Sequence, residues 1–297
     1  MTCSPAIETA GLCKSYGSTR AVRDLNLTVQ PNRITAFLGL NGAGKSTTIK
    51  MLLGMIKPTA GSGTVLGRRI DNPADSVAIR RAVAFVSEDK RLYSYMTVEQ
   101  IVRFTSGFFP GWRSDLAAAL MRKYELPPGR KVRHLSKGMR TKLDLLLAVS
   151  RHPALLILDE PSEGLDPLGI EQLLETLVTE CADGTTVFFS SHQIAEVERI
   201  SDQVCVIHKG GLVMDASLDA LRQSWRQVDI VFASIPDQAD FQMVGVERIR
   251  TRGRQMSIVA SRNVEAIVER ARDFQASTVD VTLVGLREIF LQTVEEN

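Results

Sequence analysis

The feature that most constrains the fold is a glycine-rich segment of eight residues between an apolar run and a helical pattern. The segment reads Gly39-Leu40-Asn41-Gly42-Ala43-Gly44-Lys45-Ser46, with the apolar run at residues 34–38 and the helical pattern at residues 47–55. A strand, a glycine loop and a helix in this order can cradle phosphate, because successive backbone N–H groups converge on one anion and the helix N-terminus favours negative charge. Lys45 can reach the β and γ phosphates, and the Ser46 hydroxyl can bind Mg²⁺. The segment therefore predicts a nucleotide site rather than an ordinary glycine turn.

Short apolar runs rich in Val, Ile and Phe alternate with helical patterns over the first 215 residues. They predict parallel strands of an α/β sheet at residues 34–38, 83–86, 155–158, 187–189 and 204–207. Antiparallel strands are expected within residues 7–29, and helices at 98–109 and 114–124 within an inserted helical subdomain of about residues 90–150. Beyond residue 215, strands near 228–233, 256–261 and 279–284 and helices at 263–274 and 286–295 predict a small α+β domain. The expected domains are residues 1–215 and 216–297.

Two acidic residues, Asp159 and Glu160, follow the apolar run at 155–158. At the carboxyl edge of a parallel sheet a carboxylate lies beside bound phosphates, where Asp159 can hold the water shell of Mg²⁺. Because side chains alternate along a strand, Glu160 points differently and can polarise the water that attacks the γ-phosphate. An acidic strand end alone is an ordinary turn signal. Together with the glycine loop, it predicts a hydrolytic site.

Further segments occur in a fixed order around these two features. They are Tyr16, Glu88, the segment Leu135-Ser136-Lys137-Gly138-Met139-Arg140, the segment Ser162-Glu163-Gly164-Leu165-Asp166, and Ser190-Ser191-His192. They resemble the aromatic loop, Q-loop, signature, D-loop and H-loop of ABC ATPases, and with the loop and the acidic strand they make an ordered set of seven motifs over about residues 1–215. The chain therefore resembles the ATP-binding subunit, or nucleotide-binding domain, of an ABC transporter.

The resemblance implies a P-loop ABC-ATPase fold, with a RecA-like parallel core, an antiparallel β subdomain and the helical insertion, and it implies MgATP hydrolysis. It implies catalytic roles for Lys45, Glu160 and His192, and Mg²⁺ coordination by Ser46, Glu88 and Asp159. The residues it implies for ATP contact are Tyr16, Gly39, Asn41, Gly42, Ala43, Gly44, Lys45, Ser46, Thr47, Ser136, Gly138 and Asp166. In this family two chains face head to tail, so Ser136 and Gly138 would contact ATP held by the opposite chain of a homodimer, with Asp166 across the interface. Tyr16 would stack on adenine, although ordinary strand packing is an equally simple role for it.

Two motifs depart from the family's usual form. Glu88 occupies the position at which the Q-loop usually has Gln. The Glu88 oxygens can still bind Mg²⁺, but an ionised Glu lacks the hydrogen-bond donors of a Gln amide. In the signature, Lys137 replaces a Gly and Met139 replaces a Gln. Lys137 could add positive charge near the opposite chain's γ-phosphate or remain solvated. This Ser-Lys-Gly-Met form resembles cassettes of ABC-2 type exporters, which implies export through a separate membrane permease.

Composition restricts the location and the partners. No run approaches about 18 consecutive apolar residues, and the region after Met1 lacks a signal-peptide layout. The expected location is the cytoplasm, on the cytoplasmic face of the cell membrane beside an integral membrane permease. A net charge of +2 is too small for a general polyanion surface, so no nucleic-acid partner is expected. Two alternatives stand beside the transporter ATPase: a soluble ABC-type ATPase acting on ribosomes or nucleic acid, and a module that holds nucleotide without turnover.

The domain at residues 216–297 is expected to be a regulatory or dimer-stabilising appendage. Within it, Arg248, Arg250, Arg252 and Arg254 alternate with other residues. If this stretch is a strand, all four guanidinium groups project from one face. We expect this to be a solvated face of a hairpin.

Overall fold

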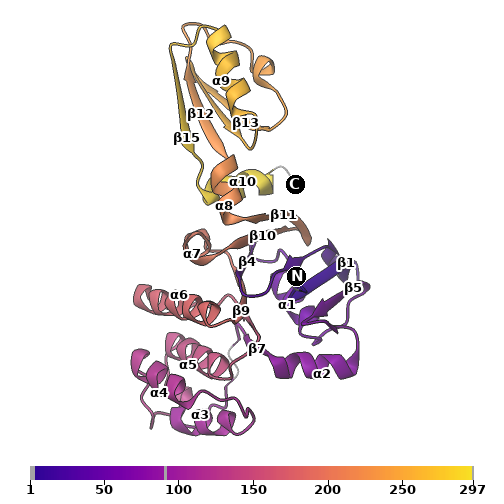
Figure 1. Cartoon of the computed structure of the whole chain (residues 1–297), viewed down its shortest axis with the longest axis vertical. Coiled ribbons are helices and arrows are strands. Elements are labelled where there is room, and N and C mark those ends of the chain that lie inside the picture. The colour runs from indigo at the N-terminus through magenta and orange to yellow at the C-terminus, as the bar shows by residue number, and fades with distance from the viewer. Residues whose placement is uncertain (1–3, 90–91, 296–297) are drawn as a thin grey trace. The chain divides into compact units, whose positions relative to one another are not determined.

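A computed structural model of the protein describes residues 4–89 and 92–295. The chain divides into two compact units, Met1–Asp215 and Ala216–Asn297 (Figure 1). Residues 90 and 91, at the expected start of the helical subdomain, lie outside the described residues. Within the described ranges, every helix is too short or too polar to cross a bilayer.

The six-stranded sheet of the first unit carries the glycine loop and the acidic strand end. Its strands lie in the order β11 (Gly211–Ser217), β10 (Gln203–His208), β4 (Ile34–Leu38), β9 (Thr186–Ser191), β8 (Leu155–Asp159) and β7 (Val83–Val86). The pairs from β10 to β7 are parallel. Strands β4, β8 and β9 are buried along their whole length, which explains why each contains an apolar run. The parallel strands predicted from the apolar runs are confirmed, and their carboxyl ends meet at one edge of the sheet.

A second sheet in this unit is antiparallel. Its order is β2 (Thr19–Leu25), β1 (Ile7–Tyr16), β5 (Ala60–Val65) and β6 (Arg68–Arg69), with β3 (Thr28–Val29) paired to β1. Helix α1 (Lys45–Leu52) contacts β2 and β5. Ile7, Leu25 and Ile49 share a buried core with Phe37 and Phe188 of the six-stranded sheet. This common core fixes the start of α1 relative to both sheets. Helix α2 (Pro73–Ala82) then leads into β7.

A group of helices follows β7, at the lower end of Figure 1. These are α3 (Val98–Ser106), α4 (Ser114–Lys123) and α5 (Lys137–Val149), and α5 contacts α3, α4 and α6 (Pro167–Ala182). The prediction that the first helix extends to residue 109 is wrong. It ends at Ser106, with Gly107 as its C-cap, and Pro110 disfavours a helical backbone at Phe109. Helix α7 (Ile194–Ile200) lies between β9 and β10 in the chain.

The second unit contains a four-stranded antiparallel sheet. Its order is β13 (Val246–Arg252), β14 (Gln255–Ala260), β12 (Arg226–Val231) and β15 (Thr278–Leu283). Helix α9 (Val264–Asp273) contacts β12, and Val228 of β12, Ile258 of β14 and Ile267 of α9 share one buried core. Helices α8 (Leu218–Ser224) and α10 (Leu286–Glu295) complete the unit.

The four alternating arginines do not share one face. Strands β13 and β14 pair Arg252 with Gln255, so that Gly253 and Arg254 form the turn of a hairpin. Gly253 has the positive φ, 61°, that such a tight turn requires. Arg248 forms an ion pair with Glu288 of α10 rather than projecting into solvent.

Candidate functional site

The glycine loop, residues 39–44, connects the end of β4 to the start of α1. A Cβ atom on Gly39 would lie 2.6 Å from the carbonyl oxygen of Ile207, and one on Gly44 would lie 2.5 Å from that of Ala21. Gly44 also has a φ of 111°, and Gly42 a φ of 80°. Side chains are disfavoured at such positive φ values. Glycine at these positions therefore lets the loop pass directly against β10 and β2 before α1 begins.

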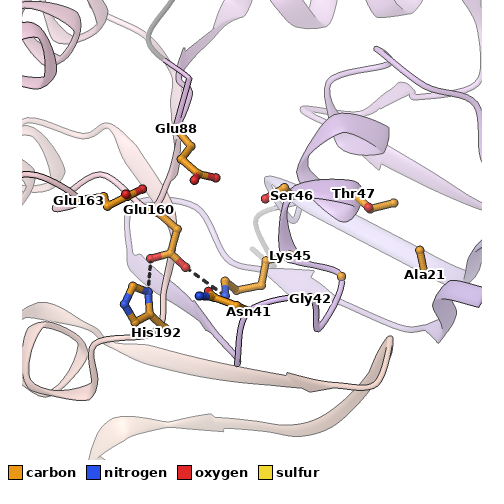
Figure 2. Close-up of a pocket in the computed structure, with 11 residues that line it drawn as sticks. Ala21, Asn41, Gly42, Lys45, Ser46, Thr47, Glu88, Glu160, Glu163 and His192 are labelled. Atoms are coloured by element: carbon orange, nitrogen blue, oxygen red, sulfur yellow. Dashed lines mark hydrogen bonds and ion pairs between the residues drawn. The ribbon is translucent and has the colours of Figure 1, made fainter. Parts of the chain in front are cut away.

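A cavity of about 550 Å³ opens beside this loop (Figure 2). Its volume is in the range of small-ligand sites. The structure brings most of the predicted site residues together around it: Asn41, Gly42, Gly44, Lys45, Ser46, Thr47, Glu88, Glu160 and His192. Ala21 and Glu163 also line it, and the sequence predicted neither as a site residue.

Glu160 lies between two cationic or potentially cationic groups, as Figure 2 shows. Lys45 Nζ is 3.0 Å from Glu160 Oε1, and His192 Nδ1 is 2.8 Å from Glu160 Oε2. Lys45 also donates hydrogen bonds to the carbonyl oxygens of Gly39 (2.6 Å) and Leu40 (3.2 Å). The contact with Lys45 is an ion pair without hydrogen-bond alignment, so Glu160 Oε1 has no hydrogen-bond partner among the described residues. That oxygen can accept a hydrogen bond from a molecule in the cavity.

Asp159 and Glu160 are both held by Ser190, which lies opposite Asp159 in the pairing of β8 with β9. The Ser190 hydroxyl donates to Asp159 Oδ1 at 2.6 Å and accepts from the Glu160 N–H at 3.0 Å. Strand β8 ends at Asp159, and Glu160 has a left-handed φ of 47°. The chain therefore turns at Glu160 instead of continuing the strand alternation that the sequence suggested. Non-glycine residues with such a backbone are uncommon and concentrate at functional sites.

Glu88 and Glu163 bring two further carboxyl groups to the cavity from separate segments. Glu88 follows β7, and Glu163 lies in the turn between Glu160 and α6. Burial, followed by the negative charges of Glu163 and Asp159, raises the pKa of the Glu88 carboxyl. Carboxyl groups therefore crowd this side of the cavity.

Several predicted contact residues do not line the cavity. Gly39, Ala43 and Asp159 are buried next to residues that do. Tyr16, at the end of β1, is 52% exposed, and Lys14 Nζ lies 5.1 Å from the centre of its ring. Tyr16 is thus not an ordinary core residue, and about half of its surface is exposed.

The predicted cross-dimer residues lie at helix starts. Ser136 caps α5 by accepting a hydrogen bond from the Met139 N–H at 3.1 Å, and Gly138 lies in the first turn of that helix. Asp166 caps α6 by accepting from the Gly169 N–H at 2.7 Å. Neither helix start lines the cavity of its own chain.

Comparisons with known proteins agree with this geometry. The ABC transporter family matches residues 22–163. The bacitracin transport ATP-binding protein BcrA of Bacillus licheniformis is 35% identical over 229 residues, which cover 75% of this chain and 74% of that protein. The Nod factor export ATP-binding protein I of Burkholderia lata is 34% identical over 232 residues, covering 76% and 75%. A solved structure of the ATP-binding subunit of an ABC transporter superposes with a TM-score of 0.67 at 32% identity, covering 73% of this chain and 92% of that one.

These similarities confirm the predicted P-loop ABC-ATPase fold and the predicted class, an ATPase. The similarity to BcrA extends over about three quarters of the chain, and the family match includes the glycine loop, the acidic strand end and most residues that line the cavity. The chain therefore belongs to the ABC transporter family, as one of its ATP-binding proteins.

Proposed function

We propose that the chain hydrolyses MgATP to drive export through a separate membrane-embedded permease, as an ABC-2 type exporter subunit on the cytoplasmic face of the membrane. The observation that carries the proposal is Glu160, held between Lys45 and His192 in a cavity beside the glycine loop. The transport and export activities in the names of the relatives support the direction and the permease partner.

ATP would bind with its phosphates over the glycine loop and the start of α1. The backbone and side chains of Gly39, Asn41, Gly42, Ala43, Gly44, Lys45, Ser46 and Thr47 would surround the phosphates. Tyr16 would stack on the adenine through its exposed ring. Lys45 now donates to loop carbonyl oxygens and pairs with Glu160. A triphosphate offers this ammonium group a more highly charged partner, which would draw it away from Glu160.

The residues present fit a magnesium ion. Ser46 and Glu88 line the cavity, Asp159 is buried next to Glu160 in the chain, and all three offer the oxygen ligands that Mg²⁺ prefers. Burial raises the pKa of Glu88 first, and the negative charges of Glu163 and Asp159 raise it further; a divalent cation would offset that negative charge. Bound Mg²⁺ would neutralise charge on the β and γ phosphates.

Glu160 would orient and polarise the attacking water. His192 fixes Glu160 Oε2, and the withdrawal of Lys45 toward phosphate would leave Oε1 to accept a hydrogen bond from water. The water oxygen then bonds to the γ phosphorus and its proton passes to Glu160 Oε1, as the bond from that phosphorus to the leaving oxygen of ADP breaks. Lys45 and His192 would stabilise the negative charge on the γ-phosphate oxygens as this happens.

We further propose that two copies of the chain close around each nucleotide. Ser136 and Gly138 at the start of α5 would present a hydroxyl and backbone N–H groups to ATP held by the second copy. Asp166 would lie across the same interface. The match to solved cassettes supports this arrangement through the shared fold.

A phosphate-release assay on the purified chain tests the proposal. We expect steady release from ATP in the presence of Mg²⁺, and a fall to background when a chelator removes the ion, because the metal offsets the charge that opposes attack. The same ATP concentration with and without chelator is the matched control. Nucleotide binding without any magnesium-dependent release would favour a module that only holds nucleotide.

We propose residues 1–215 as the ATPase domain, with its helical subdomain at about 90–150, and residues 216–297 as a dimer-stabilising accessory domain. The edge strand β15 exposes Val281 (41%) and Leu283 (70%), as strands that meet a partner often do. Removal of residues 216–297 should lower the molar mass of the assembly and reduce phosphate release. Light scattering and the release assay measure the two effects, and a shortened chain unchanged in both would refute an accessory role.

A further inference from the structure

An ion pair joins the signature segment to the wall of the cavity within one chain. Lys137 Nζ lies 2.5 Å from Glu163 Oε1. Lys137 is the first residue of α5, directly after its cap Ser136, whereas Glu163 lines the cavity. The pair therefore links two regions with different proposed roles: the chain's own nucleotide cavity, and the helix start offered to the nucleotide of a second copy.

Two glycines, Gly138 and Gly164, leave room for the close contacts beneath this pair. A Cβ atom on Gly164, which has a φ of 80°, would lie 2.6 Å from Lys137 Cδ. A Cβ atom on Gly138 would lie 3.0 Å from the Gly164 carbonyl oxygen. The stem of Lys137 thus lies across Gly164, and the first turn of α5 rests on the same residue. A lone exposed ion pair contributes little, but this one is combined with a close backbone contact.

The Glu163 end of the pair is joined through the backbone to Glu160, the proposed catalytic residue. The Glu163 N–H donates to the Glu160 carbonyl oxygen at 3.2 Å, and the Leu165 N–H donates to the Ser162 carbonyl oxygen at 3.0 Å. These bonds make residues 160–165 a compact turn. A displacement of this turn would move both Glu160 and the charge that holds Lys137.

We propose that the Lys137–Glu163 ion pair is a positioning contact that sets the start of α5 relative to the nucleotide cavity of the same chain. The inference rests on the proposed ATPase function. Both charges would then be needed for Ser136 and Gly138 to reach the nucleotide of the second copy in the correct geometry. This role differs from a direct contact of Lys137 with the opposite γ-phosphate and from a freely solvated lysine.

Reversing the charge of Lys137 distinguishes a positioning ion pair from a direct phosphate contact and from a solvated lysine. In Lys137→Glu, repulsion from Glu163 should displace the start of α5 and lower kcat about tenfold. The affinity of the single chain for ATP should remain within about twofold, because Lys137 lies outside its own cavity. Lys137→Arg keeps the cation and should retain activity. The exchange Lys137→Glu with Glu163→Lys restores opposite charges and should recover kcat to within about threefold of the original chain.

Lys123→Glu is the matched control, because Lys123 forms a 2.9 Å ion pair with Glu175 on the exposed side of α4 and α6. It should leave kcat and ATP affinity unchanged. Thermal unfolding of every variant checks that the fold persists. Full activity in Lys137→Glu would overturn the inference, and so would a double exchange no more active than Lys137→Glu, because a direct phosphate contact cannot be rescued by reversing Glu163. Failure of the unsubstituted chain to bind or hydrolyse ATP would instead refute the proposed function.

Discussion

Glu160→Gln is expected to lower phosphate release by at least about 100-fold, the loss typical of a missing general base. Gln has the size of Glu, but its neutral amide polarises water far less. The substitution also removes the charge that faces Lys45 at 3.0 Å, so the lysine is freed for phosphate and ATP binding should persist. Single-turnover phosphate release and a nucleotide titration on the same preparation measure the two properties separately.

A matched substitution at another glutamate controls for the loss of a carboxylate. Glu171 pairs with Arg199 on an exposed surface outside the cavity, so Glu171→Gln should release phosphate at the unsubstituted rate. If Glu160→Gln retained its rate to within about threefold, Glu160 could not be the group that activates water.

Gly44→Ala is expected to lower Tm by about 10 °C and to eliminate measurable ATP binding. The new Cβ would lie 2.5 Å from the Ala21 carbonyl oxygen, on a backbone with a φ of 111° that side chains avoid. The loop would have to move away from β2, which displaces Lys45 and Ser46 from the cavity. Calorimetry gives Tm, and a nucleotide titration gives the affinity.

Gly129→Ala provides the comparison for this loop substitution. A Cβ atom at Gly129 would meet no other atom within 4 Å, and its φ lies outside the positive range, so Tm and ATP affinity should both be preserved. A Gly44→Ala protein as stable and as tightly binding as Gly129→Ala would mean that the close approach of the loop to β2 is unimportant.

The sequence predicts those elements whose patterns are local. Strands β4, β8 and β9 are buried on both faces, so their apolar runs identify them directly. The glycine loop can also be identified from the sequence, because the close contacts at Gly39 and Gly44 exclude larger residues there. Ser136 and Asp166 cap their helices through hydrogen bonds within three residues of each, so these helix starts also depend on local capping chemistry.

The remaining features depend on which segments become neighbours. Ser190 supports Asp159 only because β9 pairs with β8 in one particular register. Glu163 meets Lys137 and shares the cavity with Glu88, although these three residues are far apart along the chain. Strand periodicity likewise does not predict the backbone turn at Glu160, which has a φ of 47°. Long-range pairing of this kind has no signature in a single sequence.

A calorimetric titration of ATP into the purified chain in the presence of Mg²⁺ tests the central claim most directly. Saturable binding of one nucleotide per chain, with a Kd below about 1 mM, is the predicted result. No detectable saturation with ATP, from a preparation shown to be folded, would contradict the assignment of the cavity beside the glycine loop as a nucleotide site.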